Sequence, residues 1–262
     1  MDDDEVTANA RAWSPVAAED GDRPDVAEED DADAVADADA EVDLARRLGW
    51  AKQAILAAAL VFLGIAIGIV VARDRPPGEG SVDAGFLQDM LTHHDQALGV
   101  ATLVVANGED PTVRSYAREI LVFQGYEVGV MTQTLDDWGY SRGDRSDQAM
   151  AWMDMPVPLE QMPGLLTDEQ LDQLQEVSGA ELDALFLDLM AEHHRGGLHM
   201  AEYAFGNAGD EDVSDLAARI ARNQASEINE YRALAERNGY DIDIDPASVP
   251  ADIAAAGETG GD

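Results

Sequence analysis

The histidines of this chain are few, and they fall into two matching motifs. Four of the five form the pairs His93-His94 and His193-His194, and the fifth is His199. Each pair follows a methionine, Met90 or Met190, by three residues, and the chain has no cysteine. Imidazole and thioether together suit Cu(I) and its mimic Ag(I), and imidazole alone also suits Cu(II), Zn or Ni. The two motifs therefore indicate a metal-binding site, with Cu(I) preferred.

Helical spacing places these ligands on one stripe. At about 100° per residue, the two histidines of each pair lie on either side of the preceding methionine. Met200 falls on the same stripe, at a position where the first motif has Val100, and His199 points the opposite way. A methionine at such spacing also serves as ordinary core filler, so a packing role stays open. The ligands we predict are Met90, His93, His94, Met190, His193, His194 and Met200.

Both motifs belong to an internal duplication with a constant offset of 100 residues. Phe86-Leu87 returns as Phe186-Leu187, and Gln124-x-x-Glu127 returns as Gln224-x-x-Glu227. An unbroken register of this kind predicts two copies of one structural unit. The glutamines and glutamates either hydrogen-bond to the free imidazole nitrogens or form buried polar pairs that tie helices together. This supporting set is Gln124, Glu127, Gln224 and Glu227.

Each copy has the pattern of a helical hairpin. The first copy predicts helices over about 83–106 and 111–138, and the second over about 180–205 and 212–237. Asp110-Pro111 supplies an N-cap followed by a proline at the first helical position. Short turns within each pair predict an all-α, antiparallel four-helix bundle over residues 83–240, with the repeats at 83–140 and 179–240.

The connection between the copies, residues 141–178, is rich in methionine. It holds one short helix, for which Thr167-x-x-Gln170 is the capping box. The methionines stand close together beside prolines and predict a mobile auxiliary site for a soft metal. With His199 added, the auxiliary set is Met150, Met153, Met155, Met162 and His199.

The N-terminal part changes abruptly in composition. Residues 1–45 are acidic and poor in apolar side chains, which predicts a disordered tail. Ala54–Ala72 then gives 19 residues without a charge, a helix of about 28 Å that matches a bilayer core. With its flanks, this predicts a transmembrane anchor at 46–75, followed by a Pro/Gly linker at 76–82. Residues 241–262 are predicted to form a loose acidic tail.

The basic residues on either side of the apolar segment predict its orientation. Arg46, Arg47 and Lys52 precede it, whereas Arg73 and Arg75 follow it. The excess on the N-terminal side favours a cytoplasmic tail and an extracytoplasmic C-terminal domain. A cleaved signal peptide, which would leave the domain secreted, is the alternative.

Composition and missing motifs exclude several classes of protein. A net charge of −38 repels phosphate backbones, so we expect no nucleic-acid partner. The sequence has no Glu-x-x-His, no His-Glu-x-x-His, no nucleophile elbow and no phosphate-binding glycine loop. We therefore expect a protein that is not an enzyme.

At its motifs the chain resembles the duplicated His-His "domain of unknown function" family of bacteria. The family pattern Phe-Leu-x-x-Met-x-x-His-His-x-x-Ala is matched from Phe86 to Ala97 and, with glycine in the last position, from Phe186 to Gly197. The likeness covers about residues 83–240. It implies a ferritin-like four-helix-bundle fold and a periplasmic or secreted protein that binds copper through Met and His in copper resistance. Val100 departs from the methionine common in the family, which implies two half-sites of different affinity.

These observations predict a membrane-anchored extracytoplasmic protein that sequesters copper or hands it to a copper-handling partner. One alternative is a non-catalytic structural or interaction module at the cell surface, with histidines that are buried polar residues. A more remote alternative is a metal-dependent oxidase or hydrolase.

Overall fold

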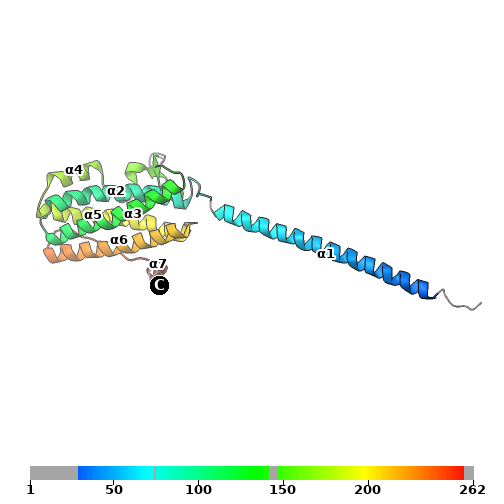
Figure 1. Ribbon diagram of the computed structural model, residues 1–262. Coiled ribbons are helices and arrows are strands. Elements are labelled where there is room, and N and C mark those ends of the chain that lie inside the picture. Colours follow the sequence, from blue (N-terminus) through cyan, green and yellow to red (C-terminus); the bar gives the residue numbers. More distant parts are fainter. Residues whose placement is uncertain (1–28, 74, 142–146, 257–262) are drawn as a thin grey trace, which may run out of the picture. The chain divides into compact units, whose positions relative to one another are not determined.

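The protein is represented by a computed structural model that describes residues 29–73, 75–141 and 147–256 (Figure 1). The chain divides into two compact units, one up to Asp74 and one from Arg75 onward. The first unit holds the helix α1, and the second holds a helical bundle with its connection.

Helix α1 spans Glu29–Arg73. Its stretch Glu41–Gly68 has a mean hydropathy of 1.9, and it is long and apolar enough to be a membrane span or a signal segment. Residues 29–45, expected to be disordered, are helical instead. Alanine has the highest helix propensity, and extending an existing helix costs less than starting one, so the Ala-Asp alternation continues the apolar helix outward. Residues 1–28 lie outside the described residues.

The predicted four-helix bundle is confirmed, and the helix bounds agree with the prediction to within one or two residues. The first hairpin is α2, Val82–Asn107, and α3, Pro111–Asp137. The second is α5, Ala180–Asn207, and α6, Glu211–Asn238. Helix α2 packs on α3, α5 packs on α6, and the two hairpins meet along α2 and α5 (Figure 1).

Aspartates at the start of α2 and α5 lock the two hairpins together. The carboxylate of Asp183 accepts hydrogen bonds from the backbone N–H groups of Glu109 and Asp110, at 2.6–3.2 Å. The carboxylate of Asp83 does the same for Gly209 and Asp210, at 2.9 and 2.8 Å. Since each aspartate binds the turn of the other hairpin, α2 and α5 run antiparallel. Burial raises the pKa of Asp183 more than these hydrogen bonds lower it.

The duplication divides the core into two equivalent clusters. The first core cluster includes Phe86, Met90, Met131 and Met200. The second core cluster includes Phe186, Met190, Val100 and Tyr231. Phe86 with Met90 in one cluster therefore corresponds to Phe186 with Met190 in the other.

The connection contains more local structure than one helix. A small antiparallel pair, β1 (Gln148–Ala149) and β2 (Val157–Pro158), brackets the 3-10 helix η1, Ala151–Met153. The 3-10 helix η2, Leu159–Gln161, follows, and then α4, Asp168–Glu176, begins with the capping box predicted at Thr167 and Gln170.

The C-terminal segment, expected to be loose, packs on the bundle as far as it is described. Ile244 and Ile253 are buried, and the Arg222 guanidinium donates to the Ile253 carbonyl at 2.9 Å. The short helix α7, Ala251–Ala256, lies against α6. These two buried isoleucines, with Ile242 and Val249 packed beside the core, supply the apolar surface that anchors the segment.

Candidate metal centre

A pair of imidazoles lies at the centre of the bundle. The rings of His93 on α2 and His193 on α5 have centroids 3.7 Å apart and planes inclined by 37°. Both side chains are fully buried. They meet because α2 and α5 run antiparallel and cross at these two positions, which the duplication relates.

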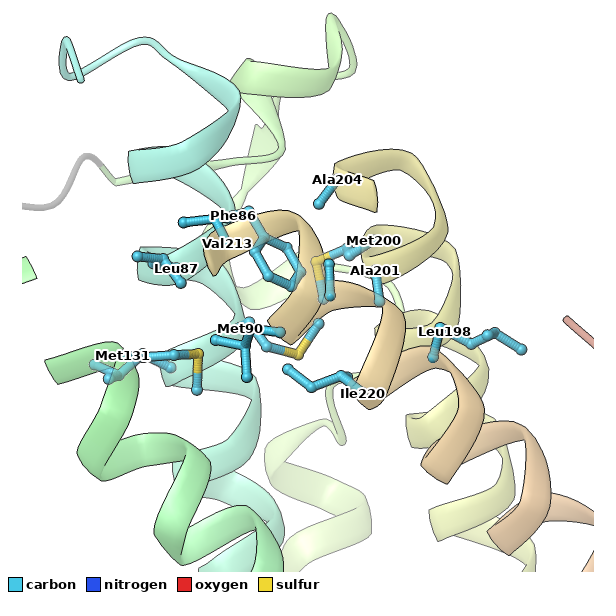
Figure 2. Close-up of a cluster of buried hydrophobic side chains, with 14 of the residues drawn as sticks. Phe86, Leu87, Met90, Met131, Leu198, Met200, Ala201, Ala204, Val213 and Ile220 are labelled. Carbon is cyan, nitrogen blue, oxygen red and sulfur yellow. The ribbon is translucent and has the colours of Figure 1, made fainter. Parts of the chain in front are cut away.

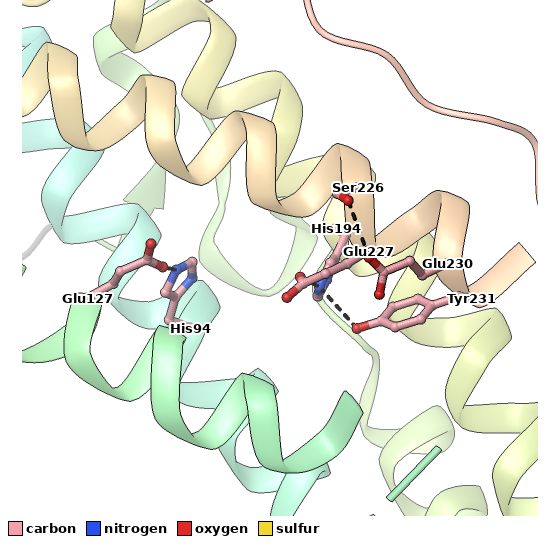
Figure 3. A network of polar contacts seen from close by, with 7 residues as sticks. All are labelled: His94, Glu127, His194, Ser226, Glu227, Glu230 and Tyr231. Atoms are coloured by element: carbon pink, nitrogen blue, oxygen red, sulfur yellow. Dashed lines mark hydrogen bonds and ion pairs between the residues drawn. The ribbon is translucent and has the colours of Figure 1, made fainter. Parts of the chain in front are cut away.

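The neighbouring histidines turn outward to the second helix of their own hairpins. His94 hydrogen-bonds through Nε2 to Glu127 at 2.9 Å, and His194 hydrogen-bonds through Nε2 to Glu227 at 2.6 Å (Figure 3). The Tyr231 hydroxyl lies 3.5 Å from the same nitrogen of His194. A carboxylate accepts the Nε2–H of its histidine, which leaves the lone pair on Nδ1.

Several buried polar atoms at this layer have no hydrogen-bond partner among the described residues. They are both ring nitrogens of His93 and His193, Nδ1 of His94 and His194, and the amide atoms of Gln124 and Gln224. A buried polar group left unpaired costs about 1–3 kcal/mol. These atoms fit a metal ion, because buried imidazole nitrogens without a hydrogen-bond partner can donate their lone pairs to a soft metal.

Burial determines the protonation of the central pair. It lowers the pKa of His93 and of His193 well below the usual value, and the neighbouring imidazoles lower both further. Both rings are therefore neutral at neutral pH and carry the lone pairs that a metal ion needs.

The methionines predicted as ligands are buried in different clusters. Met90 and Met200 share the first core cluster, where both side chains reach into the interior beside Phe86 (Figure 2). Met190 belongs to the second core cluster, in which Val100 stands where the first has Met200. Of these three predicted ligands, the structure thus places two in the first core cluster and one in the second.

The auxiliary set is divided. Met150, Met153 and Met162 are buried in the first core cluster, whereas Met155 is 52% exposed and His199 is exposed on α5. The Asp89 carboxylate fixes this part of the connection by accepting from the Met150 backbone N–H at 2.7 Å and from the Trp152 indole at 2.8 Å. Three of the methionines therefore lie in the packed core and not in a mobile loop.

Among the described residues, no three histidine, aspartate or glutamate side chains are grouped as a metal site would require. The imidazoles are arranged instead as a central pair with two outer His-Glu pairs. A complete set of ligands therefore has to include thioether sulfur or involve movement of the rings.

A turn of the connection covers the central pair. This contact was not predicted from the sequence. We call Met162–Leu166 the cover segment. Its first four residues form a turn closed by a hydrogen bond from the Leu165 N–H to the Met162 carbonyl, at 3.1 Å. Gly164 has a φ of +88° and faces His93. The Met-Pro-Gly-Leu order is the signal that could have indicated a type II turn.

Glycines allow the close approach of this turn. The Pro163 carbonyl lies against Gly196 of α5, where a Cβ atom would collide with it. Gly197 likewise leaves room for the Gln224 amide. The duplicated positions of the first copy carry Gln96 and Ala97 in place of these glycines.

A model of the family "Domain of unknown function (DUF305)" matches residues 83–235. The crystal structure of a DUF305 protein from Streptomyces coelicolor is 34% identical, with a TM-score of 0.58, and covers 62% of this chain and 96% of its own. A DUF305 fragment from Deinococcus radiodurans is 27% identical, with a TM-score of 0.50, and covers 60% and 96%. CopM in its Cu(I)-bound form is 25% identical, with a TM-score of 0.46, and covers 60% and 97%. No curated protein matches the chain.

Proposed function

This chain belongs to the DUF305 family, and we propose that it binds copper, preferentially Cu(I), at the histidine layer of its bundle. The observation that carries the proposal is the set of four fully buried histidines whose ring nitrogens include six atoms without a hydrogen-bond partner. Burying such atoms is costly unless a ligand compensates for them.

The donor types favour a soft monovalent ion. The central imidazoles are neutral, and the nearest clusters supply thioether sulfur from Met90, Met190 and Met200. Hard ions such as Mg²⁺ and Ca²⁺ prefer oxygen ligands and retain water, which an apolar interior does not offer. We assign His93, His193 and the Nδ1 atoms of His94 and His194 as the nitrogen donors.

The glutamates orient the outer imidazoles. By accepting the Nε2–H, Glu127 and Glu227 select the tautomer with a free lone pair on Nδ1. Gln124 and Gln224 make no such hydrogen bond.

We assign α1 as a membrane anchor that holds the bundle outside the cytoplasm. The apolar stretch of α1 and the excess of basic residues before it support this orientation, and the Streptomyces relative is described as a secreted protein. In that place the protein sequesters copper or passes it to a copper-handling partner, without catalysing a reaction.

The test is titration of the full chain in detergent with Cu(I) against a competing chelator. We expect His93→Ala/His193→Ala to weaken Cu(I) binding by on the order of 100-fold or more, because two donors are lost. His199→Ala is the matched control, since His199 is exposed on α5. Circular dichroism verifies that the variants are folded. Equal affinity in wild type and double variant would refute the site and favour a structural role for the histidines.

A further inference from the structure

The cover segment lies against the imidazole of His93 and the backbone of His193. A Cβ atom at Gly164 would stand 2.8 Å from His93 Nε2 and 2.5 Å from the His193 carbonyl oxygen. The backbone of the cover segment therefore lies against the two residues that carry unpaired nitrogens on both sides of their rings.

A surface hollow borders the same glycine. It has a volume of about 270 Å³, and its lining includes Gly164 and Leu166 of the cover segment and Asp188 and Glu192 of α5. Gly164 thus lines an open hollow with acidic walls and also faces His93.

The cover segment is held to the bundle by hydrogen bonds and by packing. Gln96 on α2 donates from its amide nitrogen to the Leu166 carbonyl at 2.9 Å and accepts from the Leu166 N–H at 2.7 Å. The side chains of Met162 and Leu166 are buried in the first and the second core cluster. The turn itself is rigid, because Pro163 and Gly164 occupy the positions that a type II turn favours. The cover segment therefore moves as a unit only when the two Gln96 hydrogen bonds break and these two side chains leave the core.

We propose that the cover segment is the gate of the metal centre: the ion enters and leaves through the hollow beside Gly164 when the segment swings away from Gln96. This inference rests on the proposed function. Equilibrium affinity tests the binding site, whereas exchange rates test the gate.

A second approach exists between α3 and α6, and it is less direct. A hollow of about 190 Å³, lined in part by Phe123, Glu227 and Glu230, reaches Glu227. The Glu227 carboxylate then stands between that hollow and His194, to which it is hydrogen-bonded. On the other approach, Gly164 itself both borders the hollow and faces His93.

The experiment measures loading of the full chain with Ag(I) or Cu(I), and removal of the ion by excess chelator, in a stopped-flow instrument. A gate limits removal, so the rate should reach a ceiling as chelator concentration rises. In Gln96→Ala we expect the loading rate and this ceiling each to rise about tenfold, since two hydrogen bonds of ordinary net strength are lost, with affinity unchanged. Gln133→Ala is the control, because the exposed Gln133 bonds to exposed Asp137 on α3, away from the cover segment.

A measurement on the metal-free protein provides an independent readout. The rings of His93 and His193 are fully buried, so diethyl pyrocarbonate reaches them only when the cover segment is open, and it should modify them about tenfold faster in Gln96→Ala than in Gln133→Ala. Unaltered modification there, or unaltered ion exchange rates with affinity intact, would overturn the gate. So would a Glu230→Gln variant that alone changes the loading rate, because the route would then run between α3 and α6. No binding by the wild type would instead defeat the proposed function.

Discussion

A carboxylate that is hydrogen-bonded to one ring nitrogen of a histidine determines which of the two nitrogens keeps a free lone pair. Glu227 bonds to His194 Nε2 at 2.6 Å, and its side chain is 18% exposed, whereas Glu127 makes the equivalent bond in a more enclosed place. Each outer histidine is thereby fixed in one orientation and one tautomer. The proposed metal centre depends on this support, because Nδ1 is the atom left free in both.

The substitution Glu227→Gln should weaken Cu(I) binding by about 10–100-fold, the usual cost of losing such a partner. A neutral amide accepts the Nε2–H more weakly than a carboxylate and can also present its NH₂ group, which disturbs the tautomer. Competition titration measures the effect. Glu236→Gln is the control on the same helix, since Glu236 pairs with Arg232 at the surface. The same loss in both variants would show that charge alone is responsible.

Some features at this scale could not be predicted from the sequence. A helical wheel places His93 and His94 about 100° apart on one broad face, but it does not say which neighbouring helix each one meets. The pairing of His93 with His193 depends on where α2 and α5 cross. Gly164 lies seventy-one positions from His93 in the sequence, so its contact appears only in three dimensions.

Helices could be predicted well because their start and stop signals are local. Asp110 and Asp210 both accept hydrogen bonds from the first turns of α3 and α6, as their positions in the sequence suggest. The role of Asp83 and Asp183 could not be predicted from the sequence. They also stand 100 residues apart, but their partners lie on the other hairpin, and only the fold reveals that role.

The substitution Asp183→Ala should lower the free energy of unfolding by about 2 kcal/mol. The reason is that the backbone N–H groups of Glu109 and Asp110 lose the carboxylate that accepts their hydrogen bonds. Denaturant unfolding of the metal-free chain measures this change. Glu181→Ala, at an exposed position in the same turn of α5, should cost less than about 0.5 kcal/mol. Similar losses in the two variants would contradict the interhelical role of Asp183.

Across the whole molecule, the two copies provide unequal halves around the central imidazoles. The first core cluster has Met90 and Met200, and the second has Met190 and Val100. This difference supports the expectation of two half-sites with different affinities, because the number of thioethers near each half differs.

The substitution Val100→Met should reduce that difference by adding a thioether beside Met190. We expect binding of Ag(I) to the weaker half to tighten by about tenfold, since an additional soft ligand becomes available. Calorimetric titration with Ag(I) measures it. Val104→Met, at a buried position one turn further along the same helix, adds the same volume as a control. If both variants alter the titration equally, packing and not the new sulfur is responsible.

The cover segment makes the duplicated bundle asymmetric at its centre. If two separate copies of one hairpin met about an exact twofold axis, their two central imidazoles would have identical surroundings. The cover segment touches His93 and His193 together, and it comes from the stretch that joins the copies. The two equivalent histidines of this single chain therefore share one asymmetric cover, which a strictly symmetric dimer of separate hairpins would not have.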